Sequence, residues 1–406
     1  MLRDTYPPFR PDVAVLLGQE LPARGIFTDL LAARDPSRPD TGWAGGRVRA
    51  VCLPGPKWFV YLCLPLIDFP VLRWARHADL IQARDRIRAG LLGLFTARLY
   101  RKPFVYWMSF PIAEGHRLRA REIGQLNTNR MRKLAATMRA SLATRVEDWV
   151  IQRADHLFVQ SWAMRTALAN KGIPANRMTV VPMGIDTGRF NQTAIQPLRD
   201  RALSGRKVLV YLGTTGRARA TEFLLDLAHQ LRTERPEVLL LLVGDCPNED
   251  DRIWLRSEIA NRDLKDHVHL TGWLSQADAL RWAASAQIGL SPIPRGTLFD
   301  VSSPTKVGEY LAIGLPCVAN DIPDQEFVLR QSGGGICVPM QLNAFKNAVI
   351  DLLEQPDKAA TMGARGRRWI LKHRSYERIA DEVAQAYFRI AGAPKKNAIS
   401  AQASSP

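Results

Sequence analysis

The sequence predicts an α/β protein made of two Rossmann-like domains, each with a parallel sheet. Short apolar runs such as 208–212 and 238–243 have no alternating polar positions, which is typical of strands buried on both faces. Stretches with helical spacing follow most of these runs, and such alternation favours a parallel sheet covered by helices. A chain of 406 residues is long enough to bury two cores.

The second half of the chain shows this alternation most clearly. A turn, Gly213-Thr214-Thr215-Gly216, follows its first strand, and Gly244 follows its second. The predicted strands are 208–212, 238–243, 268–270, 288–290 and 317–319, and the helices between them lie near 223–231, 253–259, 279–286 and 306–313.

The first half alternates less regularly. Its predicted strands are 26–31, 48–52, 80–83, 104–108, 155–160 and 178–181, with a long helix over 129–152. In that helix apolar residues recur every three or four positions, which predicts a face buried in the domain core. They are Leu134, Met138, Leu142, Val146 and Trp149.

We expect a first domain over 1–188 and a second over 189–373, joined near 186–201. A helix over 374–392 is expected to return to the first domain, and the small polar tail 393–406 is expected to be disordered. Open parallel sheets bind ligands at the carboxyl ends of their strands, where the strand order reverses. Two such domains place the expected site in the cleft between them.

The formal net charge is +17, and it lies mostly in the first half: residues 1–190 carry 29 Lys and Arg against 15 Asp and Glu. A basic half indicates an anionic partner, which charge alone leaves open among lipid headgroups, nucleic acid and an acidic substrate. A solvated basic surface is the simpler alternative. Nucleic acid is not expected, because the chain lacks a recognisable binding motif and interleaved aromatic residues.

The five cysteines are scattered without short pair spacings, which argues against a zinc site or a disulfide framework and favours a reducing compartment. No run reaches the roughly 18 apolar residues that a membrane span requires. The first ten residues are polar and rich in proline, unlike a secretory signal. A cytoplasmic protein is therefore expected, with peripheral membrane association left open.

The most informative segment is 302–316, where Ser302-Ser303-Pro304-Thr305 precedes a predicted helix with Lys306 and Glu309 in its first turns. Free N–H groups at a helix start, beside a lysine, suit a diphosphate. A glutamate one turn later can accept hydrogen bonds from a ribose diol. An ordinary helix cap with a surface Lys–Glu pair is the competing interpretation.

This segment resembles the carboxy-terminal signature of glycosyltransferase family 4, whose members have the GT-B fold. Four further stretches resemble the same family in the same order along nearly the whole chain. They are Val180-Val181-Pro182-Met183-Gly184-Ile185-Asp186, Ala154-Asp155-His156-Leu157-Phe158-Val159-Gln160-Ser161, Leu241-Leu242-Val243-Gly244 and Leu270-Thr271-Gly272-Trp273.

The resemblance implies a nucleotide-sugar site in the second domain, with Glu309 on the donor ribose. Two positions depart from the family pattern: Val301 stands where a first glutamate is usual, with Asp300 beside it, and Thr214 stands where an arginine is usual. Arg217 and Arg219 follow closely and are expected to hold the diphosphate together. The expected donor-binding residues are Gly213, Thr214, Arg217, Arg219, Gly272, Trp273, Leu274, Ser302, Ser303, Pro304, Thr305, Lys306 and Glu309. For Trp273, a place in the core is the alternative.

The expected catalytic residues are Arg219, Lys306 and His116. The family often has a histidine just after the strand 104–108; here Ser109 and Phe110 lie there, and His116 is the nearest histidine, with a structural role as the alternative. The resemblance implies catalysis by orienting the donor and stabilising the leaving diphosphate, with retention and without a metal ion or other cofactor.

The implied function is transfer of a sugar from a UDP- or GDP-sugar to a glycan or lipid-linked acceptor in polysaccharide or glycolipid biosynthesis. The first domain would bind the acceptor and the second the donor. Two alternatives stay open: a sugar-nucleotide-binding protein without transfer activity, motivated by Val301 and Thr214, and a sugar-nucleotide epimerase of the same fold. The sugar, the base, the acceptor and the oligomeric state are not predicted.

Residues 117–145 carry eight basic side chains against one acid, Glu122, with apolar residues between them. This pattern predicts an anionic membrane surface as the partner of residues 117–133. For 134–149 we expect the apolar positions to belong to the core. The basic residues are Arg117, Arg119, Arg121, Arg130, Arg132, Lys133, Arg139 and Arg145.

At the start of the chain, Asp4-Thr5-Tyr6-Pro7-Pro8 resembles the turn after the first strand of the family, without its glycines. Only three residues precede it, whereas a central strand needs about five. Either the first strand is shortened here, or the natural protein starts upstream of Met1, and we favour the upstream start.

Overall fold

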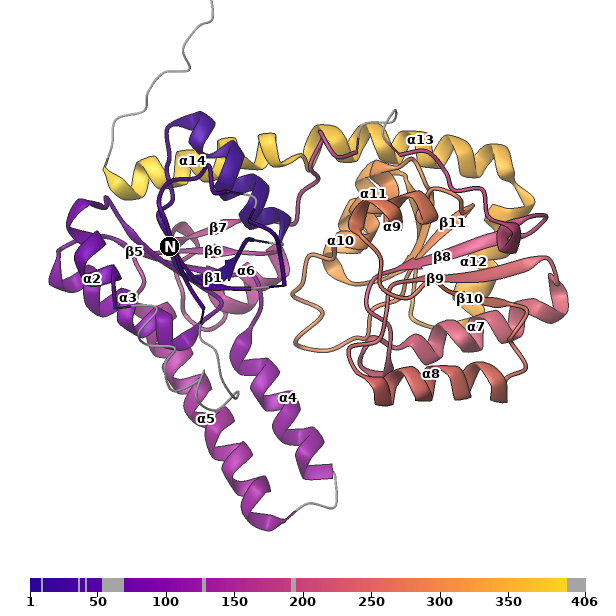
Figure 1. The fold of residues 1–406 in the computed structure, drawn as a ribbon, viewed down its shortest axis with the longest axis horizontal. Helices are drawn as coiled ribbons and strands as arrows, with labels where there is room; N and C mark the ends of the chain where they lie inside the picture. Colours follow the sequence, from indigo (N-terminus) through magenta and orange to yellow (C-terminus); the bar gives the residue numbers. More distant parts are fainter. Residues whose placement is uncertain are drawn as a thin grey trace, which may run out of the picture. The chain divides into compact units, whose positions relative to one another are not determined.

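The computed structural model describes residues 1–8, 10–35, 37–40, 42–52, 69–125, 129–190 and 195–392, with the backbone alone at 2–4 and 122–125. Two compact units divide the chain. Unit 1 contains residues 1–160, 165–181 and the chain from Glu377 onward; unit 2 contains 161–164 and 182–376. Each unit is built around one sheet (Figure 1).

Unit 1 has a seven-stranded sheet in the order β3-β2-β1-β4-β5-β6-β7, with every pair parallel. The order reverses between β1 and β4. The strands are β1 (Leu2–Tyr6), β2 (Leu30–Arg34), β3 (Val48–Val51), β4 (Ile81–Arg84), β5 (Phe104–Met108), β6 (His156–Val159) and β7 (Met178–Val180).

The helices of unit 1 cover both faces of this sheet. They are η1 (Asp12–Glu20), η2 (Pro22–Arg24), α2 (Val71–Trp74), η3 (Ala75–His77), α3 (Ile87–Leu99), α4 (Ile112–Gln125), α5 (Arg130–Arg153), from Arg165 α6 (Trp162–Ala169), η4 (Ala175–Arg177) and, from Glu377, α14 (Tyr376–Ala391). The last of these packs on unit 1, where Tyr387 donates a hydrogen bond to Gln82 and contacts Phe158.

The central strands form where the sequence predicts them, because their apolar residues are buried from both sides. All five residues of β5 are buried, as are all four of β4 and of β6. The strand predicted over 26–31 is wrong in its position, since β2 begins at Leu30. Phe27 is 69% exposed, so the apolar pair before Thr28 lies outside the sheet.

The first strand is not shortened. β1 contains Asp4, Thr5 and Tyr6, which we had expected in the turn, and it pairs with β2 as far as Tyr6. The tripeptide can extend the strand because its residues keep backbone N–H groups, whereas Pro7 cannot donate and the ladder ends before it. The strand has the ordinary length of five residues.

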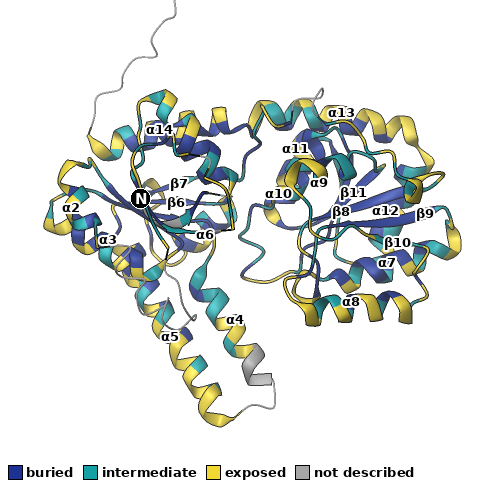
Figure 2. Ribbon diagram, viewed as in Figure 1, coloured by how far each residue is buried: buried dark blue, intermediate teal, exposed yellow. Residues whose placement is uncertain are grey.

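The long helix is confirmed as α5, but the interpretation of its apolar face is wrong. Leu134, Met138 and Leu142 are 62%, 63% and 64% exposed, and Trp149 is 44% exposed. α5 turns a different face, with the small residues Ala140 and Thr144, toward α4. The two helices form an arm that leaves the sheet of unit 1, and the first half of α5 is largely exposed (Figure 2).

Unit 2 has a six-stranded sheet in the order β10-β9-β8-β11-β12-β13, again with every pair parallel. Its strands are β8 (Lys207–Leu212), β9 (Val238–Val243), β10 (Val268–Leu270), β11 (Ile288–Ser291), β12 (Cys317–Asn320) and β13 (Gly335–Val338). The helices are α7 (Thr221–Glu234), α8 (Glu249–Asn261), α9 (Gln276–Ala283), α10 (Thr305–Ala312), α11 (Pro323–Ser332), α12 (Leu342–Glu354) and α13 (Pro356–His373), with the short turns η5 (Arg201–Leu203) and η6 (Arg217–Arg219).

Two apolar cores, one on each face of the unit 2 sheet, position its strand ends. One core joins β8 and β9 to α7 and α12 through Leu224, Leu240 and Phe345. The other joins the opposite face of the sheet to α10 through Val210, Val307 and Tyr310. The Tyr310 hydroxyl accepts a hydrogen bond from the N–H of Leu212 over 2.8 Å, so α10 is held against the central strand.

Candidate functional site

In unit 2 the strand order reverses between β8 and β11, so the carboxyl ends of these strands are the place where such a sheet binds ligands. Gly213 follows β8 with a φ of 130°, a conformation that favours glycine. A β-carbon at Gly244 would lie 2.2 Å from the carbonyl oxygen of Gly213. The two glycines therefore allow the ends of β8 and β9 to approach each other closely.

The side chain of Lys306 lies over this turn. A β-carbon at Gly213 would lie 3.3 Å from Cε of Lys306, and the ammonium lies 4.8 Å from the centre of the Tyr211 ring. Lys306 belongs to the first turn of α10, whose free N–H groups also favour an anion. A helix start, a lysine and a glycine turn therefore converge on one point, and their positive charge and free N–H groups suit an anion.

Glu309 lies one turn further along α10 and is partly buried. Burial raises the pKa of its carboxyl, while the positive charge of Lys306 opposes this shift. Its Oε1 accepts a hydrogen bond of 3.4 Å from Gln276, and Gln276 in turn accepts one from Arg189. The carboxyl is therefore held by a polar chain from a second helix, which sequence reasoning missed because Arg189 and Gln276 are distant in sequence.

The residues before α10 have different surroundings. The buried Ser303 donates a 2.6 Å hydrogen bond to Asp324 and accepts one from the N–H of Met183. Ser302 donates to the carbonyl oxygen of Phe299, whereas Thr305 is exposed after the N-cap residue Pro304. Ser303 thus fixes the loop that leads into α10, and the start of the helix itself stays accessible.

Val301 stands at the position of the missing first glutamate and has no carboxylate, and the carboxylate of its neighbour Asp300 is already paired. The carbonyl oxygen of Val301 accepts a 2.6 Å hydrogen bond from Ser161. Asp300 accepts a 2.8 Å hydrogen bond from Arg295, which also pairs with Asp321. Asp300 is therefore an ion-pair partner in its loop.

Arg217 and Arg219 both lie in the turn η6, but their contacts differ. The Arg217 guanidinium pairs with Asp251 over 2.9 Å and lies 4.9 Å from the centre of the Trp254 ring, both on α8. Arg219 is exposed and has no ion pair among the described residues. Thr214, in the preceding turn, is exposed and its carbonyl oxygen accepts a hydrogen bond from Tyr211.

The loop after β10 joins the same end of the sheet. Gly272 has a φ of 69° and forms a bridge with Gly244. Trp273 is 79% exposed, so the alternative that it belongs to the core is wrong. Leu274 packs against the core beside α10. The loop thus presents an indole ring at the strand ends, where a base could stack.

In unit 1, a buried polar cluster lies at the ends of β4 and β5. Asp85 accepts hydrogen bonds from the N–H of Ser109 over 2.7 Å and from Arg10 over 3.2 Å. Arg84 is 2% exposed and pairs with Asp12 at the start of η1. Sequence reasoning missed these residues as site candidates, although the charged pair Arg84-Asp85 directly after the predicted strand 80–83 is a signal that could have found them.

Among the described residues, no hydrogen bond or ion pair links His116 to this cluster. It lies on α4, where burial and the nearby charges of Arg119 and Arg139 lower the pKa of its imidazole. No group of three or more His, Cys, Asp or Glu side chains in the described part of the chain is arranged to hold a metal ion. No helix in that part is both long and apolar enough to span a bilayer.

Comparison with protein families gives two matches along the chain. Residues 13–189 match the model described as Glycosyltransferase Family 4, and residues 206–355 match that described as Glycosyl transferases group 1.

Curated relatives include a GDP-mannose-dependent alpha-(1-6)-phosphatidylinositol monomannoside mannosyltransferase of Mycolicibacterium smegmatis, 29% identical over 224 residues. That alignment covers 54% of this chain and 58% of the relative. A glycogen synthase of Mycobacterium tuberculosis is 23% identical over 60% of this chain and 56% of the relative. The chain thus spans less than two thirds of the length of these relatives.

Solved structures show the fold. A sucrose-phosphate synthase of Thermosynechococcus elongatus superposes with a TM-score of 0.71 at 20% identity, covering 96% of this chain and 98% of the other. HepE of Anabaena, solved in complex with UDP, superposes with a TM-score of 0.70 at 17% identity, covering 96% and 99%. Together with the two parallel sheets, these matches show that the chain has the GT-B fold, and both of its family matches are to glycosyltransferase models.

Proposed function

We propose that this protein transfers a hexosyl group from a nucleotide sugar to a lipid-linked acceptor, with unit 2 binding the donor. The observation that carries the proposal is the position of Lys306 over Gly213, with Glu309 one turn later on the same helix. The lysine and the helix N–H groups would hold the diphosphate, and Glu309 would accept hydrogen bonds from the ribose.

Departure of the diphosphate is the step that these groups would assist. As the bond between the sugar and the diphosphate breaks, negative charge grows on the leaving oxygen, and fixed cationic donors stabilise it. Lys306 and the N–H groups of α10 would supply these donors, and the exposed Arg219 of the turn η6 would add a further positive charge. We propose that the reaction retains the anomeric configuration and needs no metal ion.

We propose GDP-mannose as the first donor to test, because several curated relatives carry that name. Those names also mention phosphatidylinositol mannosides, which supports a glycolipid acceptor. A UDP-sugar is the second candidate, since HepE has been solved with UDP-glucose.

A lipid acceptor requires access to a membrane surface, and the arm of α4 and α5 has suitable features. Its exposed apolar residues Met131, Leu134, Met138 and Leu142 follow one another at helical spacing. Basic side chains lie around them, and each contributes on the order of 1 kcal/mol near an anionic surface. We propose that the protein associates peripherally with anionic membranes through this arm.

The test is to incubate the purified protein with radiolabelled GDP-mannose or UDP-glucose and a lipid extract that contains phosphoinositides. We expect a labelled lipid product from one donor and none from a Lys306→Ala variant. Binding of the donor without transfer or hydrolysis would favour the binding-protein alternative. Recovery of a sugar nucleotide with an altered sugar would favour the epimerase. Nuclear magnetic resonance of the product tests retention, and chelator treatment tests metal independence.

A further inference from the structure

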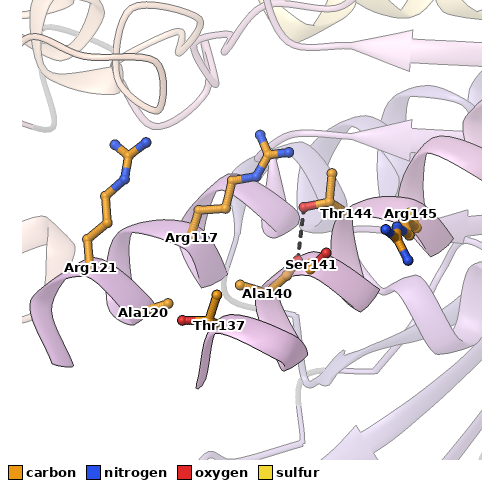
Figure 3. A pocket seen from close by; sticks show the side chains of 8 residues that line it. All are labelled: Arg117, Ala120, Arg121, Thr137, Ala140, Ser141, Thr144 and Arg145. Carbon is orange, nitrogen blue, oxygen red and sulfur yellow. Dashed lines mark hydrogen bonds between the residues drawn. The ribbon is translucent and has the colours of Figure 1, made fainter. Parts of the chain in front are cut away.

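A groove of about 460 Å³ lies between α4 and α5 in unit 1. Figure 3 shows the residues that line it, with the side chains of Arg117 and Arg121 extending from α4 in the same direction. Its lining residues are Arg117, Ala120, Arg121, Thr137, Ala140, Ser141, Thr144 and Arg145. The groove thus has three guanidinium groups and a lining of alanine and hydroxyl residues.

The charges of the groove favour an anion. Arg121 and Arg145 have no carboxylate partner among the described residues, and Arg117 pairs with Glu114 over 3.1 Å. The hydroxyl of Thr144 is already used, because it donates to the carbonyl oxygen of Ala140 over 2.9 Å. The planar guanidinium forks of the rim match the geometry of a phosphate group.

The rest of the groove favours a hydrocarbon chain. Ala120, Ala140 and the methyl groups of Thr137 and Thr144 offer apolar surface without bulk. Met138 and Leu142 each follow a groove residue of α5 by one position, which is about 100° around the helix. Met138 and Leu142, with Met131 and Leu134, form an exposed apolar stripe on α5. This stripe borders the groove, so a hydrocarbon chain that leaves the groove would contact the stripe.

The direction of α4 relates the groove to the polar cluster of unit 1. The helix starts just after Ser109 and Phe110, whose N–H groups are bonded to Asp85 at the carboxyl end of the sheet. Arg117 lies five residues into the helix, about 8 Å from its start at 1.5 Å per residue. A headgroup on the arginines could thus extend toward the strand ends while its chain runs along the arm.

We propose that this groove binds the phosphate and the first part of the hydrocarbon chain of one anionic lipid, the acceptor of the transfer reaction. The inference rests on the proposed function and adds the place and chemistry of acceptor recognition. The arginines of α4 and α5 bind the phosphodiester, and the alanine and threonine side chains contact the chain.

The test measures binding of dihexanoyl phosphatidylinositol, in monomeric form, to the full chain. The groove variant is Arg117→Gln with Arg121→Gln and Arg145→Gln. Its matched control is Arg130→Gln with Arg132→Gln and Arg139→Gln, which removes the same charge from exposed positions of α5 that do not line the groove. We expect the groove variant to lose at least about tenfold in affinity and the control to change less than about twofold.

A second pair of variants tests whether the groove binds the hydrocarbon chain of the lipid. Ser141→Trp places an indole in the groove from an exposed position, whereas Leu142→Trp places one on the neighbouring stripe. We expect only Ser141→Trp to weaken binding of the short-chain lipid, while glycerophosphoinositol, the headgroup without chains, binds both variants equally. Dihexanoyl phosphatidylcholine, which has no net charge, should bind much more weakly than the inositol lipid.

Equal losses of lipid affinity in the groove variant and in its control would overturn the groove as the binding site, because only the overall charge would then matter. Binding of vesicles with no binding of the monomeric lipid would overturn it as well, leaving a surface attraction alone. Binding of inorganic phosphate with the same affinity as the lipid would overturn the lipid assignment. GDP binding in unit 2 should be unchanged in every variant, so failure of the groove is distinguishable from failure of the donor site.

Discussion

The side chain of Lys306 covers the α-carbon of Gly213: a β-carbon at that glycine would lie 3.3 Å from Cε and 3.7 Å from Nζ of the lysine. The two residues are distant in sequence, and the reversal of strand order brings the start of α10 to the end of β8. The contact leaves the ammonium beside a backbone with no side chain, where a diphosphate can approach.

Gly213→Ala should weaken donor binding, because the new methyl group displaces Lys306 and occupies the approach to the backbone. We expect the Michaelis constant for the donor to rise about tenfold, together with a loss of roughly 1–2 kcal/mol in stability from the φ of 130°. Gly205→Ala is the control, since Gly205 also has a positive φ but nothing within 4 Å of its would-be β-carbon. If both variants alter donor kinetics equally, Gly213 has no special role.

Donor binding should weaken as the pH falls. We expect this loss to begin at a higher pH than it would if Glu309 had the pKa of an ordinary glutamate. The pKa of Glu309 is raised by burial, so its carboxylate becomes protonated earlier as the pH falls and loses acceptor capacity. Glu309→Gln should remove about 1.5–3 kcal/mol of binding free energy and should abolish the fall in donor affinity at acidic pH. The measurement is donor affinity between pH 4.5 and 8, with Glu326→Gln on α11 as the control. A wild-type donor affinity that does not fall at acidic pH would contradict the role of Glu309 in donor binding.

Replacing Arg217 and Arg219 together with alanine should raise the Michaelis constant for the donor and lower turnover. The single variants should differ, because Arg217 is engaged with Asp251 and Trp254 whereas Arg219 is accessible. We expect Arg219→Ala to reduce turnover about tenfold. Arg217→Ala should mainly lower the melting temperature. Steady-state kinetics with thermal denaturation separate the two effects, and a fully active double variant excludes a diphosphate role.

Anionic vesicles should bind the protein, and added salt should weaken binding because exposed charges are screened over about 10 Å. Charge reversal at Arg117, Arg119 and Arg121 should reduce the electrostatic part. Replacing Met131, Leu134, Met138 and Leu142 by serine should reduce the part that persists at high salt. Cosedimentation measures both. Equal binding to neutral and anionic vesicles would refute the electrostatic contribution.

The buried Glu147 should make stability depend on pH. Its Oε2 accepts a hydrogen bond from the N–H of Ala113, its Oε1 has no partner among the described residues, and burial raises its pKa to about 7. In the unfolded chain the carboxyl has its ordinary pKa of about 4.5. Between that pH and pH 7 the folded state keeps a proton that the unfolded state has lost, so stability falls as the pH rises.

The expected loss across this window is roughly 3 kcal/mol. Glu147→Gln should be more stable than the wild type at pH 8 and similar to it at pH 4. Denaturant unfolding at both values measures the effect, and Glu382→Gln, the same exchange at an exposed position of α14, is the control. A constant difference between Glu147→Gln and wild type at all pH values would exclude titration of this carboxyl.

Much of the fold followed from local patterns in the sequence. The apolar runs of β5, β8 and β9 and the start of α10 lie within a residue of their predicted positions, because a strand buried on both faces must be apolar throughout. The helix that carries Lys306 and Glu309 was also predicted from the sequence, since its residues and the preceding hydroxyl residues are contiguous.

Only the tertiary structure decided which face of α5 is covered. A periodic apolar stripe shows that one side of a helix is apolar, but Leu134, Met138 and Leu142 are exposed because α4 packs on another side. The polar cluster of unit 1 and the link from Arg189 through Gln276 to Glu309 join distant segments. Their interactions depend on how the strands are ordered in each sheet, and strand order is a property of the packed chain that no local pattern of residues encodes.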